Sequence, residues 1–160
     1  MRPTLLFAAL IALPACGGAS AEVTGSAIGI TWGESRWVYY GGPFLAISNA
    51  EVDCEGVAWV ERNYEAGQAP TDDDVQILQF AFAEDMRDGT FSIGLDASVA
   101  ATVLEVKDGA LTFERAEGGV LTVEAIEEDT SADGTFDGVL FESGTLSGSF
   151  TAEWCRNLKE

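Results

Sequence analysis

The 160-residue chain contains no histidine, and it has only eight lysines and arginines against 27 aspartates and glutamates. Without histidine, the sequence excludes Ser-His triads, Cys-His pairs and histidine-ligated metals. The shortage of basic residues gives a net charge of −19. This charge argues against DNA or RNA as a partner, because nucleic-acid affinity comes mainly from cations that displace counterions along the phosphates. Long apolar runs are missing as well, since none reaches the roughly 20 residues of a membrane-spanning helix.

Apolar residues are nevertheless plentiful enough for a folded domain. They make up 47% of the chain and charged residues only 22%, so the high net charge does not by itself indicate disorder. A chain of this length is typical of a single domain. We expect most of the acidic residues on its solvent face, where they favour solubility.

The first residues are typical of an export signal. Arg2 gives a short positive start, residues 5–13 form an uncharged apolar run, and Leu13-Pro14-Ala15-Cys16 closes the run with small residues before a cysteine. The sequence therefore predicts a removed signal peptide over residues 1–15, a cysteine and flexible tether over 16–23, and a β domain over 24–160. An ordinary secretory signal cut near Ala15 or Ala19 is the alternative.

The segment Leu13-Pro14-Ala15-Cys16 resembles the lipobox of bacterial lipoproteins. That resemblance implies cleavage before Cys16, a diacylglycerol on its thiol and a lipid anchor to the membrane. Two or three acyl chains suffice for a stable anchor. Gly17 follows where an aspartate would be the inner-membrane retention signal in some Gram-negative bacteria, so the resemblance favours the outer membrane as the location.

Cys54 and Cys155 remain once Cys16 carries lipid, and an even pair in an exported chain favours a disulfide. The alternatives fit poorly. Two distant cysteines without histidine are half a zinc site, and a redox motif would need Cys-x-x-Cys. With the cysteines assigned in this way, carboxylates are the ionisable chemistry that remains.

From Thr24 onward, apolar residues recur mostly at every second position, which is the period of a β-strand. The clearest run is the last one, where Leu146, Phe150 and Trp154 share a face. Turns rich in glycine and aspartate separate such runs at short intervals. The predicted fold is mainly β, a single antiparallel β-sandwich or barrel with one short helix. Similar alternation marks Leu78-Phe80-Phe82, Phe91-Ile93-Leu95 and Leu121-Val123.

The predicted helix lies between residues 53 and 67. Val57, Val60 and Tyr64 follow a helical period, Asp53 is a suitable N-cap, and Gly67 is a suitable C-cap. Cys54 at its start would tie the helix to the final strand. An exposed loop is expected over residues 66–74.

The best metal candidate is weak. Asp129, Ser131 and Asp133 match the opening spacing of a calcium-binding loop, but Leu140 stands at the twelfth position, where a bidentate glutamate is needed. We interpret the segment as an acidic hairpin turn and the run 72–74 of three aspartates as solvated charge. The sequence therefore predicts no metal and no cofactor.

Aromatic residues suggest either core packing or binding. The pattern through Trp37 to Tyr40 puts rings on both faces of one strand, so a ring can line a partner surface or a ligand pocket. Trp154 lies beside Cys155, where packing against a disulfide is the usual role. The aromatic set singled out is Trp32, Trp37, Tyr39, Tyr40, Trp59 and Trp154.

The segments 44–49, 53–54 and 144–155 together resemble small uncharacterised bacterial lipoproteins that end in a Gly-x-Phe-x-Ala-x-x-Cys strand. The resemblance carries no catalytic residues with it. We expect a non-enzymatic, exported and lipid-anchored envelope protein that binds a protein or polymer partner or has a structural role. The alternatives are a calycin-like barrel that binds a small apolar ligand and a weak carboxylate-based enzyme. A filled interior favours the first function and a hollow one the second.

Overall fold

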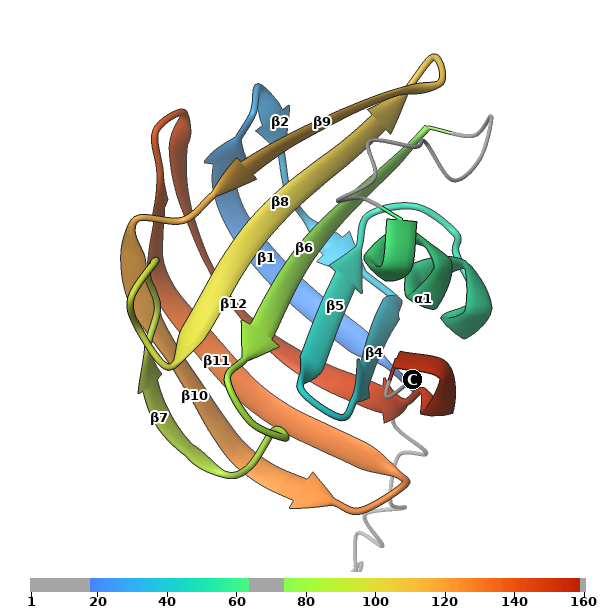
Figure 1. Cartoon of the computed structure of the whole chain (residues 1–160), viewed down its shortest axis with the longest axis vertical. Coiled ribbons are helices and arrows are strands. Elements are labelled where there is room, and N and C mark those ends of the chain that lie inside the picture. Colours follow the sequence, from blue (N-terminus) through green and yellow to red (C-terminus); the bar gives the residue numbers. More distant parts are fainter. Residues whose placement is uncertain (1–17, 64–73, 159–160) are drawn as a thin grey trace, which may run out of the picture.

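The computed structural model describes residues 18–63 and 74–158, and this part of the chain is mainly β. Twelve strands form one sheet, accompanied by the helix α1 (Cys54–Asn63) and the 3-10 turn η2 (Arg156–Leu158). The expected fold class, mainly β with one short helix, is confirmed. The sheet curls on itself into an open half-barrel (Figure 1).

The strands differ greatly in length, from two residues to eleven. In chain order they are β1 (Ser20–Ala27), β2 (Ile30–Thr31), β3 (Glu34–Ser35), β4 (Trp37–Gly41), β5 (Phe44–Ser48), β6 (Val75–Phe82), β7 (Gly89–Ser92), β8 (Val99–Lys107), β9 (Ala110–Arg115), β10 (Gly118–Glu127), β11 (Ser131–Phe141) and β12 (Gly144–Trp154). Their order in the sheet is β7-β10-β11-β12-β4-β5-β6-β8-β9, and β1 pairs with β12, β2 and β3. Among the described strand pairs, only β12 and β4 run parallel.

The curl brings two halves of the sheet face to face. We call β4, β5, β6, β8 and β9 the first half, and β1, β7, β10, β11 and β12 the second half. Phe80 of the first half meets Phe136 of the second with ring centroids 5.4 Å apart, and Phe82 meets Phe91 edge to face at 5.3 Å. Phe80, Phe82 and Phe136 belong to one buried cluster, the interior core, which fills the half-barrel, and the partly buried Phe91 packs against it.

Two glycine–phenylalanine pairs, each across neighbouring strands, allow the second half to pack closely around this core. In the register of β11 and β12, Gly134 stands opposite Phe150, and Phe136 stands opposite Gly148. A Cβ atom at Gly148 would lie 2.2 Å from the Glu22 carbonyl oxygen and 2.8 Å from the Phe136 ring. The two strands therefore approach their neighbours so closely that only glycine fits beneath each ring.

The outer face of the first half carries a second apolar cluster, the outer layer. Val57 and Ala58 of α1 pack there with Ile77 of β6 and Leu104 of β8, and all four are buried. The helix begins as predicted, because the Asp53 carboxylate accepts the Gly56 N–H at 2.8 Å and caps the first turn. The predicted C-cap, Gly67, and most of the predicted loop 66–74 lie outside the described residues.

The predicted disulfide is confirmed. Cys54 at the start of α1 is bonded to Cys155 directly after β12, with a sequence separation of 101 and 5.6 Å between their Cα atoms. The bond holds α1 against the outer face of the sheet, as the sequence predicted.

The outer face of the second half has no such apolar layer among the described residues. Instead, a row of hydroxyls crosses four strands in register, from Thr90 through Thr122 and Thr135 to Ser149. The Thr90 and Thr122 hydroxyls lie 3.3 Å apart. We call this surface the hydroxyl face.

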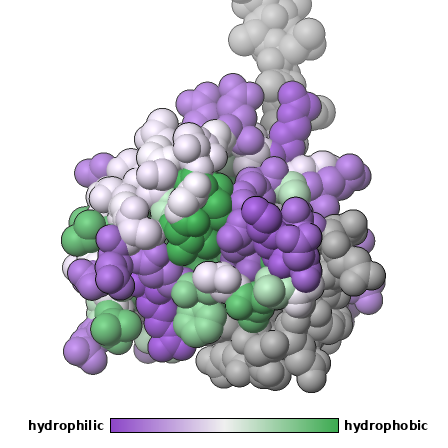
Figure 2. All heavy atoms as spheres, turned by 90° about the horizontal axis from the view of Figure 1, so that it is seen from above, coloured by the Kyte–Doolittle hydropathy of each residue, from purple (hydrophilic) through white to green (hydrophobic). Residues whose placement is uncertain are grey.

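One end of the half-barrel, the upper end in Figure 1, is closed by turns. Ser143, in the β11–β12 turn, donates its N–H to the Glu114 carboxylate at 2.9 Å, and its hydroxyl donates to the same carboxylate. The Ser143 hydroxyl also accepts the Ile28 N–H at 2.7 Å. Figure 2 looks onto this end and shows apolar atoms gathered at the centre with hydrophilic residues around them.

Two expectations about the limits of strands need correction. β1 begins at Ser20, so residues 20–23 belong to the sheet and not to a tether. Leu95 does not continue the face of Phe91 and Ile93, because β7 ends at Ser92, and the Leu95 side chain is 71% exposed.

Candidate functional site

At the other end of the half-barrel, the lower end in Figure 1, the connection between β6 and β7 crosses the opening. Residues 83–88, which we call the strap, connect β6 to β7. Two backbone hydrogen bonds hold the strap, from Ala83 N to Ser98 O at 3.0 Å and from Met86 N to Gly42 O at 2.9 Å. The second bond ties the strap to the β4–β5 turn, so the strap spans the opening.

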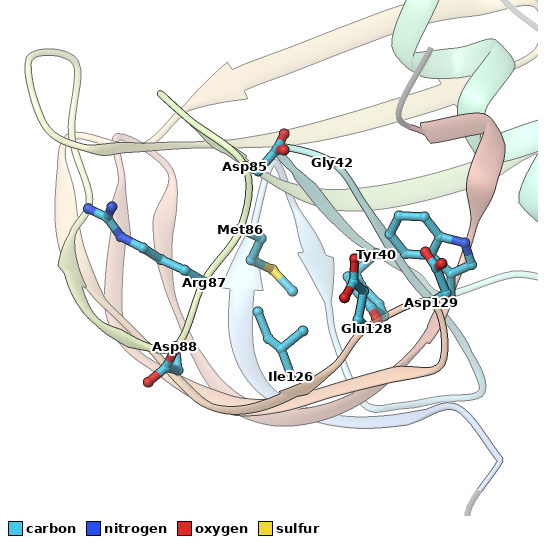
Figure 3. A pocket seen from close by; sticks show the side chains of 10 residues that line it. Tyr40, Gly42, Asp85, Met86, Arg87, Asp88, Ile126, Glu128 and Asp129 are labelled. Carbon is cyan, nitrogen blue, oxygen red and sulfur yellow. The ribbon is translucent and has the colours of Figure 1, made fainter.

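A cavity of about 310 Å³ lies between the strap, the β10–β11 hairpin and the ends of β4 and β12. It opens to solvent at this lower end, below the filled interior core. Figure 3 shows the strap passing over it and the hairpin residues on the opposite side. Its lining residues are Tyr40, Gly42, Asp85, Met86, Arg87, Asp88, Ile126, Glu128, Asp129 and Trp154.

The floor of this cavity is apolar. Met86 of the strap and Ile126 of β10 point toward one another (Figure 3), and both are partly buried against the interior core. Beside them, Tyr40 and Trp154 form an edge-to-face pair with ring centroids 5.1 Å apart. These two rings meet because β4 and β12 pair in parallel with Tyr40 opposite Trp154.

The rim of the cavity is acidic. Four acidic residues line it, Asp85 and Asp88 of the strap and Glu128 and Asp129 of the hairpin. Asp129 has a φ of 56°, a left-handed conformation that aspartate tolerates better than most residues and that the tight hairpin requires.

Arg87 is the one basic residue that lines this cavity among the described residues. Its guanidinium lies 3.2 Å from the Glu84 carboxylate and 6.0 Å from the centre of the Phe91 ring. In Figure 3 its side chain extends away from Met86 and Ile126. The acidic residues at the rim therefore outnumber this single arginine, which pairs with Glu84 at an exposed position.

The acidic residues of the hairpin affect the pKa of Tyr40. Its hydroxyl donates to the Glu127 carbonyl oxygen at 2.8 Å. Burial is the largest cause that raises the pKa of Tyr40 above its ordinary value. A hydrogen bond with the Thr130 backbone lowers this pKa, and the negative charges of Asp129, Glu127 and Glu128 raise it further. The wall of the cavity therefore lies in a negative potential.

The three calcium candidates do not form one site. Asp129 stands at the cavity rim, whereas the Asp133 carboxylate accepts the Thr151 hydroxyl at 2.6 Å and lines a separate hollow with Glu124 and Ser149. Over residues 18–63 and 74–158, no group of three or more acidic or cysteine side chains is placed to hold a metal ion. Likewise, no helix in this part of the chain has the length and apolar character needed to cross a membrane.

Sequence reasoning identified part of the cavity and missed the rest. It gave the rings from Trp37 to Tyr40 as possible lining of a partner surface or ligand pocket, and the structure places Tyr40 in the cavity. Trp154, which it assigned to packing beside the disulfide, lines the cavity as well. It did not single out Met86 or Ile126. The available signal was one large apolar residue, Met86, among the charged residues of the strap. Cys16, the predicted lipidation site, lies outside the described residues.

The fold and this site together define a class, a disulfide-bonded β half-barrel with a small cavity at one end. Comparison with known proteins identifies no relative of this chain. No protein-family model, no curated protein and no solved structure matches the chain closely enough to indicate kinship.

Proposed function

We propose that this protein is an exported, lipid-anchored binding protein of the bacterial cell envelope, without enzymatic activity, whose ligand site is the cavity at the lower end of the half-barrel. One observation carries the proposal, namely the apolar floor of Met86 and Ile126 exposed below an otherwise filled core. Exposed apolar floors in small concave sites are typical of ligand or partner binding.

The filled interior supports a site at the end of the half-barrel over one inside it. Large rings such as Phe80 and Phe136 occupy the centre, where a calycin-like barrel would hold its ligand. A deep, fully enclosed ligand therefore has no room, and the shallower site at the end is the better candidate. It suits a small ligand or a short segment of a partner.

The position of the chain start supports this assignment. The Ala19 N–H donates to the Glu153 carboxylate at 3.3 Å, and Glu153 immediately precedes Trp154 of the cavity. Cys16 is two residues before Gly18, which is at most about 7 Å of extended chain. A lipid on Cys16 therefore turns the cavity end toward the membrane.

The binding site is tested with N-phenylnaphthylamine, an uncharged apolar dye whose fluorescence rises in apolar surroundings. We expect wild-type protein to bind it and Ile126→Asn to bind it at least about tenfold more weakly, because the floor becomes polar. The matched control is Val120→Asn on the outer face of β10, where Val120 is 42% exposed. Equal loss in both variants, or loss in neither, would contradict the assignment to the cavity.

Lipid anchoring has its own test. Cells that express the wild-type chain are labelled with palmitate and fractionated, with Cys16→Ser as the control. We expect label and membrane association for the wild type and neither for the variant. An unlabelled wild type would overturn the anchor and would leave the cavity assignment standing.

A further inference from the structure

The structure also indicates which chemical class the cavity takes. Resting on the proposed function, we infer that the ligand is a small organic cation with a short apolar chain, such as an alkylammonium. The apolar chain lies on Met86 and Ile126, and the cationic head lies between the rim carboxylates and the Tyr40–Trp154 pair.

The charge balance of the cavity selects a cation. Asp85, Asp88, Glu128 and Asp129 surround the opening, and the single described arginine there is paired with Glu84. An incoming anion would meet four acidic residues and one arginine, which already pairs with Glu84. A cation gains from each carboxylate, and the net charge of −19 draws it toward the protein from solution.

The aromatic pair selects an organic head group over a bare metal ion. An indole face attracts an ammonium group more strongly than the other aromatic side chains do, and the buried Tyr40 ring holds Trp154 in place from behind. Trp154 is only partly buried, so a ligand can reach it. A metal ion would instead need several oxygens gathered at one point, and the described residues offer no such group.

The apolar floor selects a cation with a chain attached. Met86 and Ile126 make no favourable contact with a charged head group. An alkyl chain that covers them removes apolar surface from water and so stabilises the complex. Methionine adapts its shape to such chains because its side chain is unbranched and flexible. The cavity volume of about 310 Å³ limits the chain to a short one.

The inference is tested by calorimetric titration of the lipidated, disulfide-bonded protein with four probes below their micelle concentrations. Octyltrimethylammonium combines charge and chain, octyl glucoside has the chain alone, tetramethylammonium has the charge alone, and octyl sulfate has the wrong charge. We expect octyltrimethylammonium to bind about tenfold more tightly than octyl glucoside. Tetramethylammonium and octyl sulfate are expected to bind more weakly than either.

A matched pair of variants separates the rim from the overall charge. Glu128→Gln with Asp129→Asn removes two carboxylates from the rim, and Glu22→Gln with Glu124→Gln removes two exposed carboxylates that do not line the cavity. We expect the first pair to weaken octyltrimethylammonium binding about tenfold and to leave octyl glucoside binding unchanged. The second pair should change either affinity by less than about twofold, because distant exposed charges are screened at about 0.15 M salt.

The outcomes distinguish this inference from the proposed function. If octyl glucoside binds as tightly as octyltrimethylammonium and Ile126→Asn weakens both, the cavity is the ligand site but the cationic class is wrong. If tetramethylammonium matches octyltrimethylammonium, the apolar chain is not recognised and the inference fails. If no probe depends on Ile126, the inference and the cavity assignment fail together. Because the rim carboxylates are exposed, these variants should fold, and an unchanged melting temperature checks this.

Discussion

The two halves of the sheet share one interior core, but their outer faces differ in polarity. In the first half, the outer face of β5, β6 and β8 is apolar and is covered by α1 and η2. In the second half, the outer face of β7, β10, β11 and β12 carries a row of hydroxyls and no apolar layer among the described residues. The sheet is therefore buried on both faces in the first half and on its inner face in the second half.

This difference explains two kinds of strand sequence. β12 alternates cleanly, with Leu146 and Phe150 inside and Thr145 and Ser149 outside. β6 alternates over Leu78, Phe80 and Phe82 but also carries apolar residues on its other face, because Ile77 belongs to the outer layer and Leu78 to the interior core. Strands buried on both faces carry apolar residues on both, whereas strands with one wet face keep the clean alternation.

The largest expected effect comes from removing the disulfide that holds α1 on the outer face of the first half. We expect Cys54→Ala with Cys155→Ala to lower the free energy of unfolding by up to about 4.7 kcal/mol, the chain-entropy value for a loop of about 100 residues. The measurement is urea unfolding without reductant, compared with wild type. Cys16→Ser keeps the disulfide and should leave this free energy unchanged. A loss below about 1 kcal/mol would mean that the outer layer holds without its covalent clamp.

One substitution made in both halves compares the two outer faces directly. Leu104 on β8 is 1% exposed within the outer layer, and Leu140 on β11 is 45% exposed. Leu104→Ala should cost about 3 kcal/mol, because it leaves a cavity in a packed layer. Leu140→Ala should cost less than about 0.5 kcal/mol. Chemical denaturation of both variants checks the difference, and equal costs would show that the two outer faces are equally buried in solution.

A smaller effect tests how the second half curves. Gly148→Ala places a Cβ within 2.8 Å of the Phe136 ring and 2.2 Å of a backbone oxygen, so we expect a loss of about 2 kcal/mol from overpacking. Gly118→Ala is the matched control, because nothing lies within 4 Å of its added Cβ. Thermal unfolding of the two variants makes the comparison. If Gly148→Ala is as stable as the control, the close approach of β12 to β1 is not required by the fold.

Local signals predicted much of this architecture, whereas the cavity needed knowledge of the sheet order. The alternation of β12, the Asp53 cap and the pairing of Cys54 with Cys155 depend on neighbouring residues or on a simple cysteine count, and all three are confirmed. The cavity instead joins Met86 to Ile126, forty residues later. Their approach depends on β7 pairing with β10, which no local pattern specifies.

The smallest expected effect concerns β4, where the two halves meet. Tyr39 and Tyr40 are neighbours on opposite faces of this strand. The Tyr39 hydroxyl donates to the Val52 carbonyl oxygen at 3.1 Å on the side of the outer layer, and the Tyr40 hydroxyl donates to the Glu127 carbonyl oxygen at the cavity. Burial is the largest cause that raises each pKa. Nearby negative charges raise both further, from Glu153 and Asp53 for Tyr39 and from the hairpin acids for Tyr40.

Ultraviolet titration of tyrosinate separates the two sides of the sheet. We expect Glu128→Gln with Asp129→Asn to lower the ionisation pH of Tyr40 and to leave that of Tyr39 in place, whereas Glu153→Gln should do the reverse. Tyr40→Phe and Tyr39→Phe assign each transition by removing it. If both tyrosines respond equally to the hairpin variant, the negative potential is not confined to the cavity side.

The same raised pKa values fix the direction of the pH dependence of stability. Below the ordinary tyrosine pKa of about 10, both phenols are protonated in the folded and the unfolded chain, and their contribution is fully present. Above it, the unfolded chain loses its protons first, so the free energy of unfolding falls as the pH rises through the folded pKa values. Urea unfolding across this range should show a shallower fall for Tyr40→Phe than for wild type, because phenylalanine has no proton to lose. An equal fall would mean that Tyr40 ionises alike in both states and that the acidic hairpin does not act on it.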